Sequence, residues 1–207
     1  MDDQSAGGRM VVVFFGMTAS GKSFLAKAWA RRQGFPYFNT DIIRKEIVAV
    51  EPERVFEQGL DKGVYSREFS RKTYDTLLAC AERVFAETIC RCVVLDGSFQ
   101  AASERKRLIE RMANVAQVFF ILCRCSESLT RKRLRERLQD DKAVSDGNLD
   151  VYLKQKKCFD ASAEIPSGWL LELDTSASLE YLIERLEHFL SSSDLSEEAG
   201  GTRPTNP

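Results

Sequence analysis

The sequence predicts an α/β protein in which helices flank a five-stranded parallel sheet. Short, continuously apolar runs alternate along the chain with longer segments of helical periodicity, and this alternation is typical of a parallel sheet with helices on both faces. The first apolar run, Met10–Phe15, leads directly into a glycine-rich turn and a helix. That order predicts a functional site at the carboxyl ends of the strands.

Each element is predicted from its own local pattern. Continuous apolar runs fit strands that are covered on both faces, and we expect strands at 10–15, 37–39, 92–96, 115–123 and 169–173. Thr40 is the expected N-cap of the second helix, and Gly34 ends the first. From helical periodicity and caps we expect helices at 22–33, 41–50, 66–87, 103–112, 127–139, 149–159 and 178–190.

One domain is expected over residues 10–190, with a small helical lid at about 126–160. The polar residues 1–9 are expected to form a flexible leader. Residues 191–207 are polar and contain glycine and proline, so we expect a disordered tail.

Composition limits the function classes. With 30 Lys and Arg against 31 Asp and Glu, the net charge is −1, which gives no bulk attraction to nucleic acid and leaves only a local basic patch open. No apolar run approaches the ~20 residues that span a membrane, and no signal-peptide core is present, so no membrane partner is expected. The 6 cysteines lack C-x-x-C spacing and are expected to be reduced, mostly packed thiols of a cytoplasmic protein.

The segment G-M-T-A-S-G-K-S, residues 16–23, fits the pattern G-x-x-x-x-G-K-[ST]. After a buried strand and before a helix, this motif cradles phosphate with its backbone N–H groups. Lys22 would reach the terminal phosphates and Ser23 would ligate Mg²⁺. The alternative is a chance match in an ordinary turn. The residues expected to bind ATP are Gly16, Thr18, Ala19, Ser20, Gly21, Lys22, Ser23 and Phe24.

A second candidate lies after the second strand, where Asp41 and Arg44 share one face of a helix start. A carboxylate beside a guanidinium stays ionised, and here it could accept the proton of an attacking hydroxyl. Arg44 could instead hold a substrate anion. The alternative is a surface ion pair near a helix cap.

A third candidate is Asp96 in V-V-L-D-G-S-F, at the end of a buried strand. An acid in this position supports Mg²⁺ directly or through water, and Ser98 could contact metal or substrate. The alternative is an Asp-Gly turn.

The helix at 127–139 is rich in arginine. Arg133 and Arg137 flank its apolar seam on one side, and Arg131 and Arg135 flank it on the other. A lid arginine can stabilise the charge that builds on a transferring phosphoryl group. For any single arginine, a solvated face is the alternative. His188, the only histidine, lies far along the chain from every motif, so histidine chemistry is not expected.

Together with F-N-T-D-I-I-R-K-E-I and the R-L-R-E-R-L lid helix, these motifs resemble the AAA-type P-loop kinases. That group includes polynucleotide 5′-hydroxyl kinases, zeta-toxin-like kinases and a branch of predicted bacterial kinases. The resemblance covers residues 10–190 and implies a nucleoside-monophosphate-kinase-like fold. It also implies Lys22 and Ser23 as ligands of phosphate and Mg²⁺, Asp41 as general base with Arg44 as its partner, Asp96 as the strand-end acid, and Arg133 and Arg137 as lid arginines.

The chain departs from these relatives in two respects. Many of them have D-A-[ST] where this chain has Asp96-Gly97-Ser98, and we expect the glycine to loosen that turn. The lid is short and has no zinc-type set of cysteines. The substrate-facing segment, 49–70, differs widely among such enzymes.

The sequence therefore predicts a kinase that uses ATP and Mg²⁺ to phosphorylate a hydroxyl of a small molecule. One alternative is a polynucleotide 5′-hydroxyl kinase, against which the balanced net charge argues. The other, from a different class, is a nucleotide-binding regulatory module with slow ATPase activity.

Overall fold

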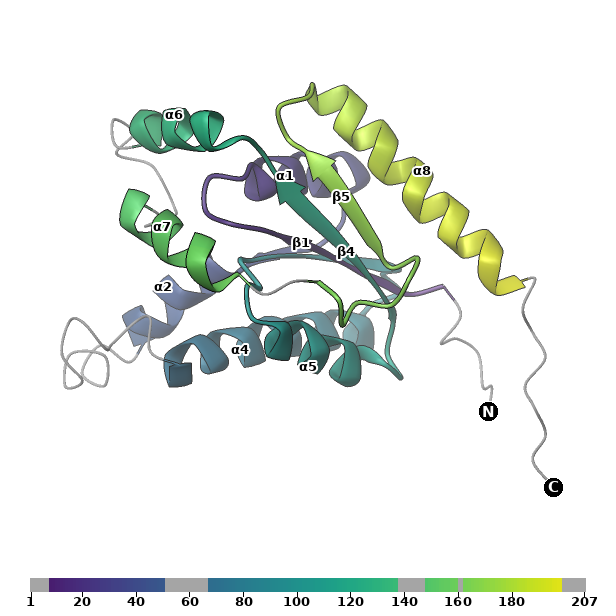
Figure 1. Cartoon of the computed structure of the whole chain (residues 1–207). Coiled ribbons are helices and arrows are strands. Elements are labelled where there is room, and N and C mark those ends of the chain that lie inside the picture. The colour runs from purple at the N-terminus through teal and green to yellow at the C-terminus, as the bar shows by residue number, and fades with distance from the viewer. Residues whose placement is uncertain (1–7, 51–66, 138–147, 160–161, 199–207) are drawn as a thin grey trace.

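A computed structural model describes residues 8–50, 67–137, 148–159 and 162–198 of the chain. Its centre is a five-stranded, wholly parallel sheet of order β2-β3-β1-β4-β5 (Figure 1). The predicted fold class is confirmed. The strands are β1 (Met10–Phe15), β2 (Tyr37–Asn39), β3 (Cys92–Asp96), β4 (Gln117–Arg124) and β5 (Leu170–Asp174).

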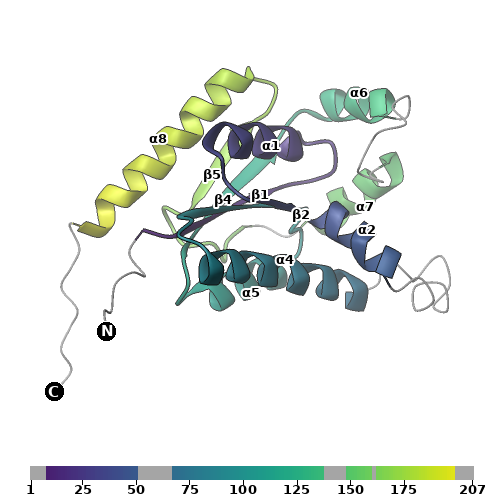
Figure 2. The same cartoon turned by 180° about the vertical axis from the view of Figure 1, so that it is seen from behind.

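Helices cover both faces of the sheet (Figures 1 and 2). One face carries α1 and α8, and the other carries α4 and α5, while α2, α6 and α7 lie toward the carboxyl ends of the strands. The described helices are α1 (Lys22–Gln33), α2 (Thr40–Val50), α4 (Arg67–Glu87), α5 (Ala102–Met112), α6 (Glu127–Arg137), α7 (Leu149–Cys158) and α8 (Leu179–Glu198).

The core consists of two layers because successive side chains of β1 point to opposite faces. Val11, Val13 and Phe15 pack on the side of α4 and α5. Val12 and Phe14 pack on the side of α1 and α8. All five are fully buried, which explains why this strand is continuously apolar. The strand in the middle of the sheet is thus held rigidly just before the glycine-rich loop.

The C-terminal helix is longer than the sequence predicts. We expected disorder from residue 191, but α8 continues to Glu198. Ser191 and Ser192 donate hydroxyl hydrogen bonds to the carbonyls of Glu187 and His188, one turn earlier. No glycine or proline interrupts the chain before Gly200, so the polar composition does not break the helix. Residues 199–207 lie outside the described part of the chain, as do 1–7 of the predicted leader.

Other boundaries that differ from the prediction move by one or two residues, which is ordinary for helix and strand ends. Residues 138–147 of the predicted lid and residues 51–66 of the predicted substrate-facing segment lie outside the described part of the chain. All six cysteines are unpaired, as predicted, but fewer are buried than expected: Cys92 and Cys123 are buried, Cys80, Cys90 and Cys125 are half-buried, and Cys158 is exposed. Among the described residues, no helix is both long enough and apolar enough to cross a membrane.

Candidate active site

The glycine-rich loop between β1 and α1 is shaped by residues in the left-handed backbone region. Gly16, Ala19 and Gly21 have φ angles of 140°, 58° and 86°. Left-handed residues interspersed with right-handed ones turn successive N–H groups toward one concavity, which binds anions. Ala19 adopts this conformation in spite of its Cβ, and such strain concentrates at ligand sites.

Two glycines of the loop are required by close packing. A Cβ at Gly16 would lie 2.4 Å from the carbonyl oxygen of Cys123, and one at Gly21 would lie 2.8 Å from Oγ1 of Thr175. The loop also begins under restraint, because the N–H of Gly16 donates to the carbonyl of Ser98 at 3.3 Å. The loop is therefore tied to the ends of β3, β4 and β5.

The loop presents polar groups that its own fold leaves unsatisfied. Thr18 and Ser20 are buried, and their hydroxyl oxygens have no hydrogen-bond partner among the described residues. Buried polar groups are usually paired, so such atoms mark a place for a ligand. Lys22 opens α1, and its Nζ donates to the carbonyl of Met17 at 3.3 Å, so the ammonium lies against the loop.

Asp96 lies at the carboxyl end of β3, level with Phe14 of β1 and Asn39 of β2. Its side chain is fully buried. Oδ2 accepts hydrogen bonds from the Tyr37 hydroxyl at 2.5 Å and from Nδ2 of Asn39 at 2.6 Å. Burial and then the charge of Asp96 raise the pKa of Tyr37, which keeps the phenol a neutral donor. The other oxygen, Oδ1, has no partner among the described residues.

This arrangement fits Mg²⁺. The ion is usually held by one or two carboxylates, by substrate phosphates and by water, not by a cage of protein ligands. The described residues contain no group of three or more His, Cys, Asp and Glu side chains that could form such a cage. The unpartnered Oδ1 of buried Asp96 and the hydroxyl of Ser23, in the first turn of α1, are suitable oxygen donors.

The second predicted constellation is brought together at the start of α2. Nη1 of Arg44 lies 3.0 Å from Oδ1 of Asp41, whose side chain is 31% exposed. Thr40 is not the N-cap. Asn39 has that role, because its Oδ1 accepts from the N–H groups of Asp41 and Ile42 at 2.9 and 3.1 Å. Thr40 is instead the first helical residue, and it is buried.

Thr40 also explains the glycine after Asp96. A Cβ at Gly97 would lie 2.7 Å from Cγ2 of Thr40 and 3.2 Å from the ring of Phe99. The expectation that Gly97 loosens this turn is therefore wrong. The glycine allows Thr40 to pack tightly against it, and the N–H of Gly97 donates to the carbonyl of Phe14 at 3.2 Å.

The turn beyond Gly97 is held in an uncommon conformation. Phe99 has a φ of 39°, its N–H donates to the Tyr74 hydroxyl at 3.0 Å, and its carbonyl accepts from Nη1 of Arg105 at 2.6 Å. The Tyr74 hydroxyl also lies 3.3 Å from Oγ of Ser98. Burial raises the pKa of Tyr74, so the phenol remains neutral. The position of Ser98, two residues after Asp96, is thus held by Tyr74.

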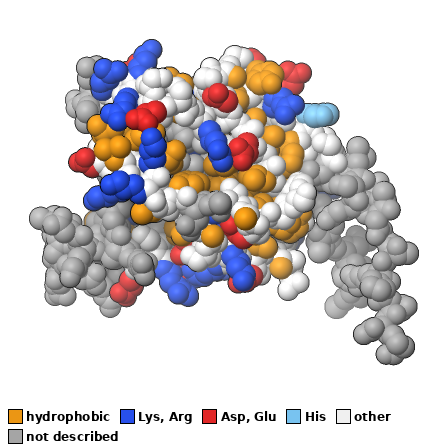
Figure 3. All heavy atoms as spheres, in the orientation of Figure 1, with side chains coloured by type: hydrophobic (Ala, Val, Ile, Leu, Met, Phe, Trp, Pro, Cys, Tyr) orange, Lys and Arg blue, Asp and Glu red, His pale blue; other side chains and the backbone are white. Residues whose placement is uncertain are grey.

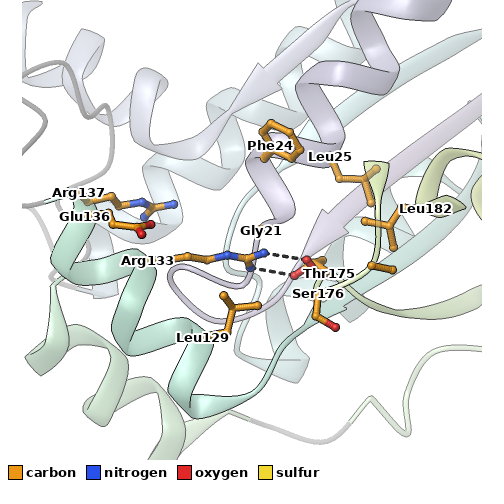
Figure 4. A pocket seen from close by; sticks show the side chains of 11 residues that line it. Gly21, Phe24, Leu25, Leu129, Arg133, Glu136, Arg137, Thr175, Ser176 and Leu182 are labelled. Atoms are coloured by element: carbon orange, nitrogen blue, oxygen red, sulfur yellow. Dashed lines mark hydrogen bonds between the residues drawn. The ribbon is translucent and has the colours of Figure 1, made fainter. Parts of the chain in front are cut away.

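A cavity of about 490 Å³ opens beside the glycine-rich loop, between α1, α6 and the turn after β5 (Figure 4). Its walls combine apolar and cationic side chains. Phe24, which is 67% exposed, lies on this cavity. The lining residues are Gly21, Phe24, Leu25, Leu129, Arg133, Glu136, Arg137, Thr175, Ser176, Ala177 and Leu182.

The two predicted lid arginines, Arg133 and Arg137, both line this cavity. Nη1 of Arg133 donates to Oγ1 of Thr175 at 3.0 Å and to the carbonyl of Ala19 at 3.3 Å, and Nη2 donates to the carbonyl of Thr175 at 2.7 Å (Figure 4). Arg133 therefore joins α6 to the phosphate loop and to the end of β5. Arg131 lies elsewhere on α6, in an exposed ion pair with Glu127.

Several side chains of the site were not singled out from the sequence. Asn39 is part of the F-N-T-D segment, where an Asn directly before a helix was a signal for a cap. No local sequence pattern marked Tyr37, Tyr74 or Thr175 as site residues, because their roles depend on partners from other strands and helices. Gln155 of α7 also belongs to the site, since its Oε1 accepts from the N–H of Thr18 at 2.6 Å.

Three features define the P-loop NTPase fold in its kinase form. They are the glycine-rich loop after the central strand, the buried acid at the end of the neighbouring strand, and the order of the strands in the sheet. The structure is similar to a gluconokinase from Sinorhizobium meliloti 1021, with TM-score 0.63 and 17% identity over 96% of this chain and 100% of that one. An APS kinase from Mycobacterium tuberculosis gives TM-score 0.57 and 18% identity over 89% and 98%. A shikimate kinase from Aquifex aeolicus gives TM-score 0.53 and 13% identity over 90% and 98%.

The sequence itself assigns the family. Residues 11–162 match the family model described as AAA domain, and the chain belongs to that family. The match begins in β1 and extends past the end of α7, so it includes the glycine-rich loop, Asp96 and the helices α6 and α7. No curated protein sequence matches the chain.

Proposed function

We propose that this protein is an ATP-dependent kinase that transfers the γ-phosphoryl group of ATP to a hydroxyl of a small molecule. One observation supports this proposal above the others: two carboxylates with different surroundings lie at the carboxyl ends of the neighbouring strands β2 and β3. Asp96 is buried with one oxygen unpartnered, whereas Asp41 is partly exposed and paired with Arg44. Phosphoryl transfer uses one acid that supports the metal and another that accepts the proton of the acceptor hydroxyl. These different surroundings suit those two roles.

In this proposal the phosphate loop and Lys22 bind the triphosphate. Ser23 and Asp96 would hold Mg²⁺, which supplies charge neutralisation on the β- and γ-phosphates. Asp41 accepts the proton of the acceptor hydroxyl as its oxygen attacks phosphorus. Arg44 orients the carboxylate of Asp41 through their 3.0 Å contact. Arg133 and Arg137 would stabilise the charge of the transferring group or of the bound nucleotide.

The cavity beside the loop supports a nucleoside as the carrier of the phosphates. It has apolar walls at Phe24, Leu25 and Leu182, and guanidinium groups from Arg133 and Arg137. Flat aromatic bases stack on phenyl and guanidinium planes, and the volume of about 490 Å³ is in the range of small-ligand sites. A nucleotide could therefore place its base here and its phosphates in the loop.

The surface favours a small acceptor over a polynucleotide. Where α6 and α7 lie, basic side chains have acidic ones among them (Figure 3). Arg131 and Lys156 both pair with Glu127. These pairs reduce the positive potential that a nucleic-acid backbone would require. A 5′-hydroxyl oligonucleotide therefore stands as the second candidate acceptor, and a regulatory nucleotide-binding module as the third candidate function.

An acceptor screen tests the proposal. ATP consumption with Mg²⁺ would be measured against sugars, sugar acids, nucleosides, amino alcohols, aminoglycosides and 5′-hydroxyl oligonucleotides. We expect stimulation by one small-molecule class, with loss of at least 100-fold in Asp41→Asn and retention of ATP binding. Lys45→Ala, which changes a neighbouring exposed residue of α2, is the matched control. Tight ATP binding without stimulation by any acceptor would favour the regulatory module.

A further inference from the structure

The lid helix α7 places a glutamine in the phosphate loop. Oε1 of Gln155 accepts a hydrogen bond from the N–H of Thr18 at 2.6 Å, across 137 residues of sequence. Thr18 N–H is one of the backbone donors in the loop whose left-handed residues shape it for an anion. An amide oxygen therefore occupies a hydrogen-bonding position that the loop offers to a phosphate oxygen.

The position of Gln155 is fixed by its own helix. Tyr152 lies one turn earlier on α7, so both side chains project from one face. Tyr152 is 3% exposed and packs with Ala19 and Leu134, with Met17 against the same cluster. Ala19 and Met17 flank Thr18 in the loop. Tyr152 thus packs α7 directly against the loop. This packing places Gln155 within hydrogen-bonding distance of the Thr18 N–H.

We propose that Gln155 competes with the nucleotide phosphates for the loop and so couples the position of α7 to nucleotide binding. The inference rests on the proposed function, because it assumes that the loop binds a triphosphate. One N–H makes one good hydrogen bond, so a phosphate oxygen on Thr18 and the Gln155 amide oxygen exclude each other. Before nucleotide binds, Gln155 satisfies the donor and holds α7 over the loop.

The exchange favours the nucleotide. A hydrogen bond to an ionised phosphate is roughly twice as strong as one to a neutral amide. Apart from Gln155, the described contacts of α7 with the loop and α6 are the small Tyr152 cluster and an exposed pair between Lys156 and Glu127 at 2.7 Å. Exposed pairs contribute little, so the Tyr152 cluster is the main described contact that holds α7 on the loop and α6. Gln155 therefore lowers nucleotide affinity without abolishing binding.

Gln155→Met tests the competition, because methionine keeps the length of the side chain and removes the carbonyl oxygen. The loss of a neutral hydrogen bond predicts affinity for MgATP about 2- to 10-fold tighter than that of wild type. Adenosine, which carries no phosphate, should bind with unchanged affinity. Cys158→Ala, at an exposed position on the same helix, is the control and should match wild type. Unchanged or weaker MgATP binding by Gln155→Met would overturn the proposal, and so would equal tightening for adenosine.

Amide exchange of the ligand-free protein separates this inference from the proposed function. The N–H of Thr18 should be protected in wild type and in Cys158→Ala, and should exchange at least threefold faster in Gln155→Met. Equal exchange in all three proteins would refute the contact itself. If wild type shows this protection but does not bind MgATP, the nucleotide-binding function fails, and the competition fails with it. If wild type shows this protection and binds MgATP, but Gln155→Met does not bind MgATP more tightly than wild type, only the competition is rejected.

Discussion

Asn39 contacts both acidic residues of the site through its two amide atoms, the carboxylate of Asp96 and the backbone of Asp41. Its Nδ2 donates to Oδ2 of Asp96 at 2.6 Å, while its Oδ1 caps α2 by accepting from the N–H of Asp41 at 2.9 Å. One side chain therefore orients the acid proposed for the metal and fixes the backbone that carries the proposed base. Both contacts belong to an amide that is 6% exposed.

Asn39→Ala should lower both the free energy of unfolding and kcat, and its effect on kcat should exceed that of removing a helix cap elsewhere in the protein. The loss of a helix cap costs about 1 kcal/mol, and the buried Asp96 also loses a donor. We expect a lower midpoint of urea unfolding and a fall in kcat of at least tenfold. Ser178→Ala, which removes an Oγ acceptor for the Tyr181 N–H at the start of α8, is the control for a lost cap. If both variants reduce kcat equally, Asn39 has no role beyond capping.

Arg105 is a second connection that depends on the whole fold. Its side chain is fully buried, forms an ion pair with Glu164, and donates to the carbonyls of Phe99 and Gln100. The guanidinium also lies over the rings of Phe15 and Phe159. It thus links the strand end before the phosphate loop, the turn after Asp96 and the segment that follows α7.

Arg105→Leu should therefore destabilise the protein strongly. Removal of one partner of a buried ion pair typically costs 3–5 kcal/mol, because the remaining charge and the carbonyls lose their partners. Its neighbour Lys106 has an exposed contact with Glu110 at 3.9 Å, so Lys106→Ala should cost less than about 0.5 kcal/mol. Urea unfolding of both variants measures the difference. Similar losses for the two variants would contradict the role assigned to Arg105.

Local patterns predicted the fold and the phosphate loop, because their signals lie within short stretches of sequence. β1, the loop and the start of α1 form one such stretch, and the bounds predicted for β1 and α1 are those observed. The predicted pairing of Asp41 with Arg44 is also local, and its contact is present. Whether these residues act in catalysis stays a prediction.

The connections between elements could not be predicted in the same way. Arg105 and Glu164 are 59 residues apart, and Gln155 and Thr18 are 137 apart. Neither pair has a spacing that a helix or strand repeat would reveal. Asn39 was missed as a cap because Thr40 is also a common capping residue, and only the burial of Thr40 and the side-chain contacts of Asn39 distinguish the two.

Buried thiols and phenols should make the protein less stable in alkaline solution. Burial raises the pKa of Cys123 to about 12, and it also raises the pKa values of Cys92 and Tyr74. An unfolded thiol loses its proton near pH 8.5. Above that pH the unfolded state binds fewer protons than the folded state, so the free energy of unfolding falls until the folded thiol also ionises.

Urea unfolding between pH 8 and pH 10.5 measures this effect. Cys123→Ala should make the decline with pH shallower, by at most about 1.4 kcal/mol per pH unit, because one titrating group has been removed. Cys158→Ala removes an exposed thiol and should leave the slope of wild type unchanged. Parallel curves for wild type and Cys123→Ala would show that the Cys123 thiol does not contribute.

Lys22→Ala tests whether the loop binds phosphate through its lysine. At a concentration 100 times its Kd, a ligand stabilises the folded state by about 2.7 kcal/mol, and each kcal/mol raises the Tm of a protein of this size by about 2–4 °C. We expect MgATP to raise the Tm of wild type by several degrees and that of Lys22→Ala by less than one degree. Arg32→Ala, an exposed cation in the last turn of α1, should respond like wild type. Among the described residues the Nζ of Lys22 makes one hydrogen bond, to the carbonyl of Met17, so its loss should hardly change the Tm without nucleotide. An equal response of Lys22→Ala and wild type to MgATP would mean that the triphosphate does not bind in this loop.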